Sequence, residues 1–253
     1  MAGYNTSMMN TSKRLPIVFC LDVSPSMGWN TGFGSSSSMD LLNTAVRNFI
    51  EEIKADPKAR ACAEVSFVTF SSDVEMSTNF ESVSTMKVPR FQAVREGGTQ
   101  MALAVMRAIN KIEARREQLE DLEIPYYAPF LVIVTDGNPD QNDNQETAEI
   151  ALKMIRSHCA SDIGANEVIV PFVIGVGNIE NSRTLREYVS GFSDGYFPIN
   201  GKASAANTQF KKVFQMIGDS TKKSVHLNGT GKEIIETLKS DMNDLLRDLQ
   251  GIG

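Results

Sequence analysis

The sequence predicts an α/β fold: a doubly wound, mainly parallel sheet of six strands with one antiparallel edge strand and helices on both faces. Runs such as LPIVFCLDV, PFLVIVTDG and EVIVPFVIGVG are apolar at nearly every position, as strands buried on both faces are. These runs alternate with segments whose apolar residues recur at helical spacing. Alternation of this kind is typical of a parallel sheet covered by helices.

The elements follow in order along the chain. Strands are expected at residues 15–23, 62–72, 74–80, 129–137, 167–177 and 195–199, and helices at 35–56, 100–119, 144–159, 182–191, 207–224 and from Thr230 onwards. The gap between the second and third strands is too short for a crossover helix, so the third strand is predicted to be antiparallel. Thr230 and Glu233 form a capping-box pattern at the start of the last helix.

Composition excludes several classes of protein. The 253 residues carry a net charge of −6, with 42% hydrophobic and 22% charged residues, which argues against broad nucleic-acid binding. No apolar run reaches the length of a membrane span. The widely spaced Cys20, Cys62 and Cys159 suggest neither a disulfide framework nor a zinc site, and we expect a cytoplasmic protein.

Polar side chains gather where the first and fourth strands end. Asp22, Ser24 and Ser26 alternate at the end of the first strand, and Asp136 ends the fourth. Thr99 lies in the loop before the long helix, where it is also expected to be the N-cap. Ligands of open α/β sheets bind at the carboxyl ends of strands near the switch in strand order, so these five side chains are predicted to surround one point.

All five are hard oxygen donors, which favours Mg²⁺, with Mn²⁺ or Ca²⁺ as alternatives, over zinc. A cation bound mainly by neutral hydroxyls keeps much of its positive charge. It would therefore accept a carboxylate from another molecule at an open coordination position.

The pattern Asp22-x-Ser24-x-Ser26, followed by Thr99 in GGT and Asp136 in TDG, resembles the metal-ion-dependent adhesion site, or MIDAS, of von Willebrand factor type A domains. The resemblance covers about residues 14–225 and fills all five positions. It implies that Ser24, Ser26 and Thr99 bind the cation directly and that Asp22 and Asp136 act directly or through water. It also implies that the cation grips a Glu or Asp of a protein partner.

The segments KRLPIVFCLDVSPSM and FKKVFQMIGDSTKKSV resemble a narrower group, the stand-alone bacterial TerY-like proteins of tellurite and stress resistance. This resemblance implies a cytoplasmic protein whose partner is a kinase or phosphatase encoded nearby. The insertion at 28–38 is longer than the usual link of the family. Its Trp29, the only tryptophan, is a candidate partner-binding residue.

We expect three parts: a flexible segment at 1–13, the type A domain at 14–225, and an amphipathic C-terminal helix at 226–253 that packs on the domain or docks to a partner. The predicted function is metal-dependent protein binding without catalysis. One alternative is a metal-dependent hydrolase or phosphatase using Arg95 or Lys202, although His158 and His226 lie away from the strand ends. The other is a domain whose cation only rigidifies loops.

Overall fold

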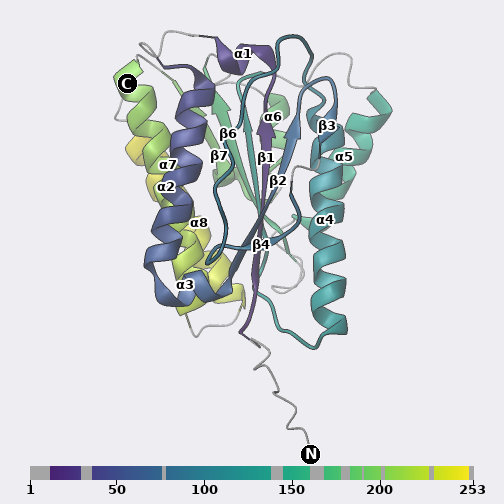
Figure 1. The fold of residues 1–253 in the computed structure, drawn as a ribbon, viewed down its shortest axis with the longest axis vertical. Coiled ribbons are helices and arrows are strands. Elements are labelled where there is room, and N and C mark those ends of the chain that lie inside the picture. The colour runs from purple at the N-terminus through teal and green to yellow at the C-terminus, as the bar shows by residue number, and fades with distance from the viewer. Residues whose placement is uncertain are drawn as a thin grey trace, which may run out of the picture.

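The structure is a computed structural model in which α-helices flank a central sheet (Figure 1). It describes residues 12–29, 36–75, 78–137, 145–159, 168–177, 183–189, 191–200, 203–227 and 231–250. The predicted flexible segment lies outside these residues up to position 11. At the start of the described chain, the Lys13 ammonium lies 4.0 Å from the centre of the Tyr127 ring.

The sheet has the order β3-β2-β1-β5-β6-β7, with β4 also paired to β2. Its strands are β1 (Leu15–Asp22), β2 (Ala63–Phe70), β3 (Val74–Glu75), β4 (Glu81–Ser82), β5 (Phe130–Thr135), β6 (Val170–Val176) and β7 (Tyr196–Ile199). All neighbours are parallel except β3 and β4, which run antiparallel to β2. The predicted fold class is confirmed, and the strand order reverses at β1, which lies between β2 and β5.

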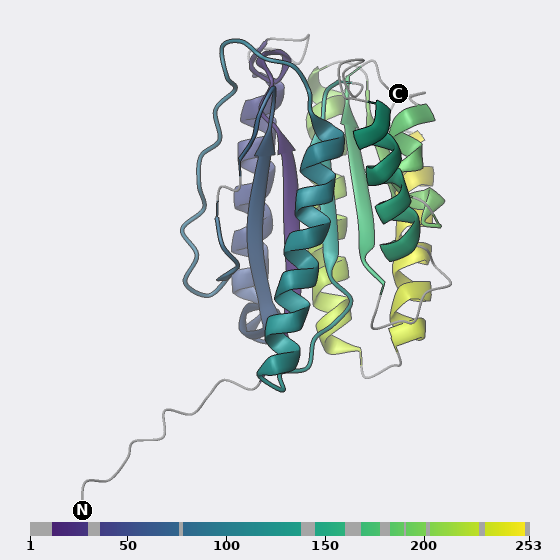
Figure 2. The ribbon, with the colours of Figure 1, turned by 90° about the vertical axis from the view of Figure 1, so that its right-hand side faces the viewer.

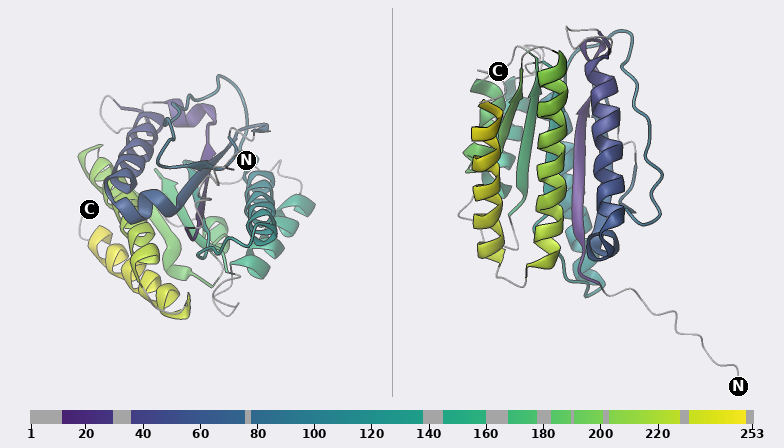
Figure 3. Two further views of the ribbon diagram at one scale, coloured as in Figure 1. Left: turned by 60° about the horizontal axis from the view of Figure 1, so that its bottom comes forward. Right: turned by 90° about the vertical axis from the view of Figure 1, so that its left-hand side faces the viewer.

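Helices cover both faces of the sheet. They are α1 (Pro25–Gly28), α2 (Ser38–Ala55), α3 (Pro57–Cys62), α4 (Met101–Asp121), α5 (Gln145–His158), α6 (Arg183–Glu187), the 3₁₀ turn η1 (Ser193–Gly195), α7 (Ala203–His226) and α8 (Gly231–Gln250). Helices α4 and α5 stand on one face (Figure 2), while α2, α7 and α8 stand on the other (Figure 3).

Strand β1 shows why the core strands are apolar throughout. Ile17, Phe19 and Leu21 pack into the core beneath α2 and α7, whereas Val18 and Cys20 pack into the core beneath α4 and α5. Successive side chains of a strand point to opposite faces, so a strand covered on both sides needs apolar residues at every position. Asp22 breaks this pattern only at the strand end.

The last helix, α8, packs along α7 and η1. Its apolar stripe is buried there, including Leu238 and Met242. Two polar contacts fix its position: Asn243 donates to Asp194 at 2.9 Å, and Lys223 on α7 forms an ion pair with Asp241 at 2.7 Å. Within the described residues, no helix is long and apolar enough to cross a membrane.

The structure differs from the prediction at several elements. The sheet contains seven strands rather than six. In place of the single strand expected at 74–80 there are two short strands, β3 and β4, and each pairs separately with β2. The short helices α1 and α3 were not predicted. His226, beyond the helix predicted at 207–224, ends α7, and its ring nitrogen bonds to Asp56 at 2.8 Å. The predicted cap Thr230 lies outside the described residues.

Candidate metal centre

The carboxylate of Asp22 is fixed at the carboxyl edge of the sheet. Strands β1 and β5 are parallel and pair Leu21 with Val134, which places the next residues, Asp22 and Thr135, side by side. Thr135 Oγ1 donates to Asp22 Oδ2 at 2.6 Å, and the Ser24 amide donates to Oδ1 at 2.8 Å. Asp22 is fully buried, and both of its oxygens accept protein hydrogen bonds.

A chain of oxygens connects the first strand loop to the β5 loop. Ser24 Oγ lies 3.0 Å from Ser26 Oγ, and Ser26 Oγ donates to Asp136 Oδ1 at 2.8 Å. Ser26 belongs to α1, the helical turn that begins directly after Ser24. The turn therefore brings the second serine of the pattern to a carboxylate 110 residues away in the sequence.

Thr99 joins the same group from the loop before α4. A Cβ atom placed on Gly137 would lie 3.7 Å from Thr99 Oγ1, so the hydroxyl faces the loop that carries Asp136. Gly97 makes the approach possible. Its φ is +152°, and a Cβ there would lie 2.3 Å from Ser71 Oγ, a position and conformation that only glycine tolerates.

The expectation that Thr99 caps α4 is wrong. The helix begins at Met101, and its cap position is Gln100. The Gln100 amide donates to the Ser71 carbonyl at 2.8 Å, which draws the backbone toward the end of β2 and delays the helix by one residue. Thr99 consequently lies in the loop, one residue before the cap.

Burial disfavours the charged form of both carboxylates. It raises the pKa of Asp22, although hydrogen bonds from Ser24 and Thr135 oppose the shift. Burial also raises the pKa of Asp136 to about 6. The hydrogen bond from Ser26 opposes this increase in pKa, and the neighbouring Asp22 charge adds to it. Two neighbouring desolvated carboxylates are stabilised when a cation is placed between them.

The oxygen spacing is compatible with a small divalent cation. An octahedral Mg²⁺ with oxygen distances of 2.0–2.1 Å has adjacent ligands about 3.0 Å apart. The serine hydroxyls are 3.0 Å apart, and Ser26 Oγ lies 2.8 Å from Asp136. Ser24, Ser26 and Thr99 would hold such an ion, and Asp22 and Asp136 would balance its charge. Within the described residues, neither this edge nor any other place gathers three His, Cys, Asp or Glu side chains as ligands.

The remaining predicted site residues lie in different settings. Trp29 follows α1 beside the serines and is 64% exposed. Arg95 is an exposed residue of the loop that leads to Thr99, whereas Lys202 lies outside the described residues. His158 ends α5, where it contacts Glu113. Sequence reasoning missed Thr135, which orients Asp22; its hydroxyl next to Asp136 at a strand end was the available signal.

Together these features define a doubly wound α/β domain with a cluster of hard oxygen donors at the carboxyl edge of its sheet. The model of the von Willebrand factor type A domain matches residues 17–213. The chain therefore belongs to this family. A search of curated protein sequences finds no match.

Solved structures share the fold at low sequence identity. The PilB minor pilin from Streptococcus sanguinis is 14% identical, with a TM-score of 0.54, over 83% of this chain and 62% of the pilin chain. BatB from Bacteroides thetaiotaomicron is 15% identical, with a TM-score of 0.51, over 83% of this chain and all of its own. Proximal thread matrix protein 1 from the mussel byssus, with a zinc-occupied MIDAS motif, is 14% identical, with a TM-score of 0.50, over 80% of this chain and 48% of its own.

Proposed function

We propose that the protein is a metal-dependent protein-interaction module that binds a Glu or Asp of a partner through a divalent cation. The observation that carries this proposal is the chain of oxygens from Ser24 through Ser26 to Asp136. Neutral hydroxyls make up most of this set, so the cation keeps charge that attracts a further carboxylate. A carboxylate ligand adds charge-assisted bonding that a neutral ligand lacks.

Two features of the site support binding over hydrolysis. The Asp22 carboxylate, the more buried of the two, already accepts hydrogen bonds from Ser24 and Thr135, which suits a positioning role better than that of a general base. Both histidines are at the ends of helices, where they pair with Glu113 and Asp56. A metal-dependent hydrolase or phosphatase and a purely structural cation remain the alternatives.

Magnesium is the proposed cation, because hydroxyl and carboxylate oxygens at this spacing suit a small hard ion. Manganese and calcium share the same ligand preference. The zinc-occupied motif of the mussel protein makes zinc a necessary competitor in any titration.

The biological setting is proposed from the sequence resemblance to TerY-like proteins. In that setting the module works in the bacterial cytoplasm, in a tellurite or stress-response assembly whose partner is a kinase or phosphatase. Exposed Trp29 lies at the metal edge and offers the large amphipathic surface that is common at binding hot spots. It is the proposed source of selectivity, since one metal–carboxylate bond discriminates poorly between partners.

The decisive experiment has two stages. Calorimetric titration with Mg²⁺, Mn²⁺, Ca²⁺ and Zn²⁺ compares the wild type with Ser26→Ala. Ser84→Ala is the control, because Ser84 is an exposed serine that hydrogen-bonds to Ser82 in the β4 turn. Affinity capture from the native host then compares wild type and Ser26→Ala, each with and without chelator. The proposal expects metal binding to be lost in Ser26→Ala and kept in Ser84→Ala, and partner capture to be lost in Ser26→Ala and in wild type treated with chelator.

Other outcomes decide among the alternatives. Metal binding with partner capture that survives chelator contradicts the metal bridge and favours a structural cation. Metal-dependent turnover of a phosphate ester that is lost in Ser26→Ala favours the hydrolase. Trp29→Ala is expected to keep metal affinity and to weaken a captured partner by about 2 kcal/mol, the usual threshold of a hot spot.

A further inference from the structure

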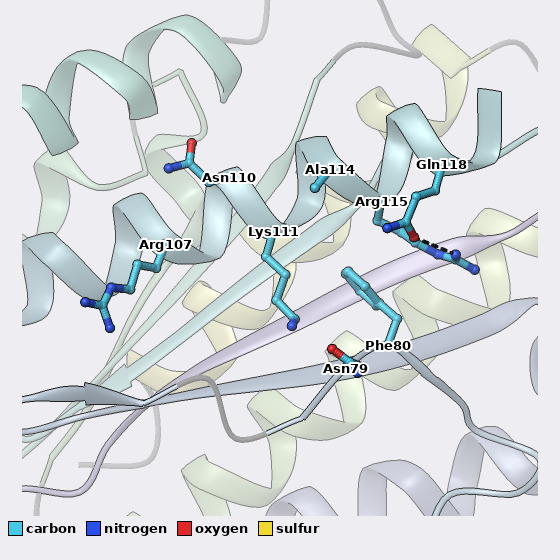
Figure 4. A pocket seen from close by; sticks show the side chains of 8 residues that line it. All are labelled: Asn79, Phe80, Arg107, Asn110, Lys111, Ala114, Arg115 and Gln118. Carbon is cyan, nitrogen blue, oxygen red and sulfur yellow. Dashed lines mark hydrogen bonds between the residues drawn. The ribbon is translucent and has the colours of Figure 1, made fainter. Parts of the chain in front are cut away.

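A hollow lies away from the metal edge, between α4 and the chain that enters β4 (Figure 4). Its volume is about 700 Å³, within the range of small-molecule sites. Three cationic side chains of α4, those of Arg107, Lys111 and Arg115, line it, and none of its described lining residues is Asp or Glu. A basic hollow of this kind is unexpected in a chain with a net charge of −6.

The three cations differ in how their charge is balanced. Arg115 forms two hydrogen bonds with the Glu64 carboxylate, at 2.6 and 2.7 Å, so its charge is neutralised. Arg107 donates to the Val74 carbonyl, which is neutral. Among the described residues, no carboxylate forms an ion pair with Arg107 or Lys111.

Of the three cationic side chains, Lys111 is the strongest candidate to bind an anion. It is half-buried, and Figure 4 shows its side chain reaching from α4 toward Asn79 and the Phe80 ring. Its ammonium lies 5.9 Å from the centre of that ring, at the limit of a cation–π contact. Burial lowers the pKa of Lys111, because no anion compensates for the water it has lost.

The rest of the lining supplies neutral hydrogen-bonding groups and one flat ring. Asn79, Asn110 and Gln118 contribute carboxamides, and Gln118 accepts a hydrogen bond from Arg115 at 3.2 Å. Phe80 lies between Lys111 and Arg115 in the close view. The hollow therefore combines unbalanced positive charge, an aromatic surface and amide groups.

We propose that this hollow is a second ligand site, which binds a small molecule carrying a phosphate or carboxylate on a flat ring. The anionic group pairs with the ammonium of Lys111, with Arg107 adding positive charge beside it. The ring packs against Phe80, where offset or edge-to-face contacts are favourable. Asn79, Asn110 and Gln118 hydrogen-bond polar atoms on the edge of the ligand.

The site is separate from the metal centre. Lys111 follows the first residue of α4, Met101, by ten positions, which is about 15 Å along a helix. Since Met101 follows the Thr99 loop, α4 connects the two sites without sharing a residue between them. Binding at the hollow can therefore be measured on metal-free protein.

The test is a set of NMR titrations of the metal-free full chain, with the chelator dialysed away. Four probes separate the parts of the ligand: phenyl phosphate, benzoate, inorganic phosphate and benzyl alcohol. We expect phenyl phosphate to bind tightest, benzoate and inorganic phosphate more weakly, and benzyl alcohol weakest. A binding order in which benzoate exceeds phenyl phosphate assigns the anionic group as a carboxylate and leaves the site in place.

Variants locate the binding. Lys111→Gln keeps a long polar side chain and is expected to weaken phenyl phosphate about tenfold, as the loss of a charge-assisted hydrogen bond does. Phe80→Leu should weaken phenyl phosphate and leave inorganic phosphate unchanged. Lys153→Gln, which removes an exposed lysine of α5, is the matched control and should bind as the wild type does.

Melting temperatures establish that each variant is folded. Equal affinity of Lys111→Gln and Lys153→Gln for phenyl phosphate would overturn the proposal, as would an absence of saturable binding by the wild type at millimolar concentration. Equal binding of phenyl phosphate and benzyl alcohol would also overturn it, because the hollow would then select only an apolar ring.

Discussion

The N-terminal end and the middle of α4 border sites of opposite charge. At its N-terminal end, Asp22 and Asp136 are desolvated carboxylates beside three hydroxyls. Farther along, Lys111 is a desolvated ammonium beside carboxamides. Each site contains a charge that the described residues leave unbalanced. The carboxylates of the first site call for a cation, the ammonium of the second calls for an anion, and these are the proposed ligands.

The Glu64–Arg115 pair shows the contrasting case. The Glu64 side chain is 7% exposed and that of Arg115 22% exposed, yet each neutralises the other through two hydrogen bonds. A balanced pair of this kind calls for no ligand. The comparison therefore distinguishes charged side chains that stabilise the fold by pairing with each other from charged side chains proposed to bind a ligand. Mutation can test this distinction.

The largest effect is expected from breaking the balanced pair. Arg115→Met leaves the Glu64 carboxylate buried without its partner and should lower the free energy of unfolding by about 3 kcal/mol, the lower end for such pairs. Urea unfolding followed by circular dichroism measures the change. The double variant Arg115→Met with Glu64→Leu should recover most of the loss, and a single variant as stable as the wild type would disprove the structural role.

Supplying the missing cation should have the next largest effect. Mg²⁺ at a hundred times its dissociation constant should raise the free energy of unfolding by about 2.7 kcal/mol, and removing it with a chelator should reverse the gain. The metal-free protein should still fold, since two large apolar cores lie on either side of the sheet. Thermal melts of wild type, Ser26→Ala and the control Ser84→Ala provide the measurement, and stabilisation of Ser26→Ala equal to that of wild type would argue against the site.

Removing an unbalanced carboxylate should stabilise the metal-free protein. The pKa of Asp136 is raised to about 6 in the folded protein, so the charged carboxylate lowers the free energy of unfolding. This destabilisation is fully present above pH 6 and disappears as the pH falls through 6 toward the ordinary pKa near 4. Asp136→Asn should therefore raise stability at pH 7.5 by about 1–2 kcal/mol, with little gain at pH 4.5. Urea melts at both pH values measure this, and a larger gain at pH 4.5 would reverse the sign of the argument.

The smallest effect is expected at Lys111. Lys111→Met keeps the aliphatic stem and removes the unbalanced charge, so we expect a gain of about 0.5 kcal/mol, the size typical of surface substitutions. Lys153→Met, at an exposed position of α5, should produce no gain. A clear loss of stability in Lys111→Met would mean that the ammonium is already balanced in the folded protein.

Much of the fold, and the meeting of the polar side chains at the strand ends, could be predicted from sequence because strong local signals agree with one another. β1, β5 and β6 are apolar at nearly every position, and parallel pairing then brings Asp22 to Thr135 and Asp136. The serine spacing of two did not reveal α1. That helical turn nevertheless carries Ser26 to Asp136.

Other features depend on contacts that no local pattern carries. β4 is two residues long and exists through its pairing with Glu64 and Val65, while the cap of α4 shifts because Gln100 bonds to Ser71. The hollow joins Phe80 to residues about thirty positions later on α4. The short helix α3, by contrast, had a sequence signal that could have predicted it: Asp56 caps it through the amides of Lys58 and Ala59, and a proline stands at its start.

The antiparallel pairing of α7 and α8 has a practical consequence for attaching the molecule to a surface. α8 returns toward the metal edge, so its C-terminal end lies where the strands finish, whereas β1 begins at the opposite end (Figures 1 and 3). A tether joined after Gln250 would crowd the face that a partner must approach. A tether joined before Ser12 would present that face outward, and sensor-chip measurements should be oriented in this way.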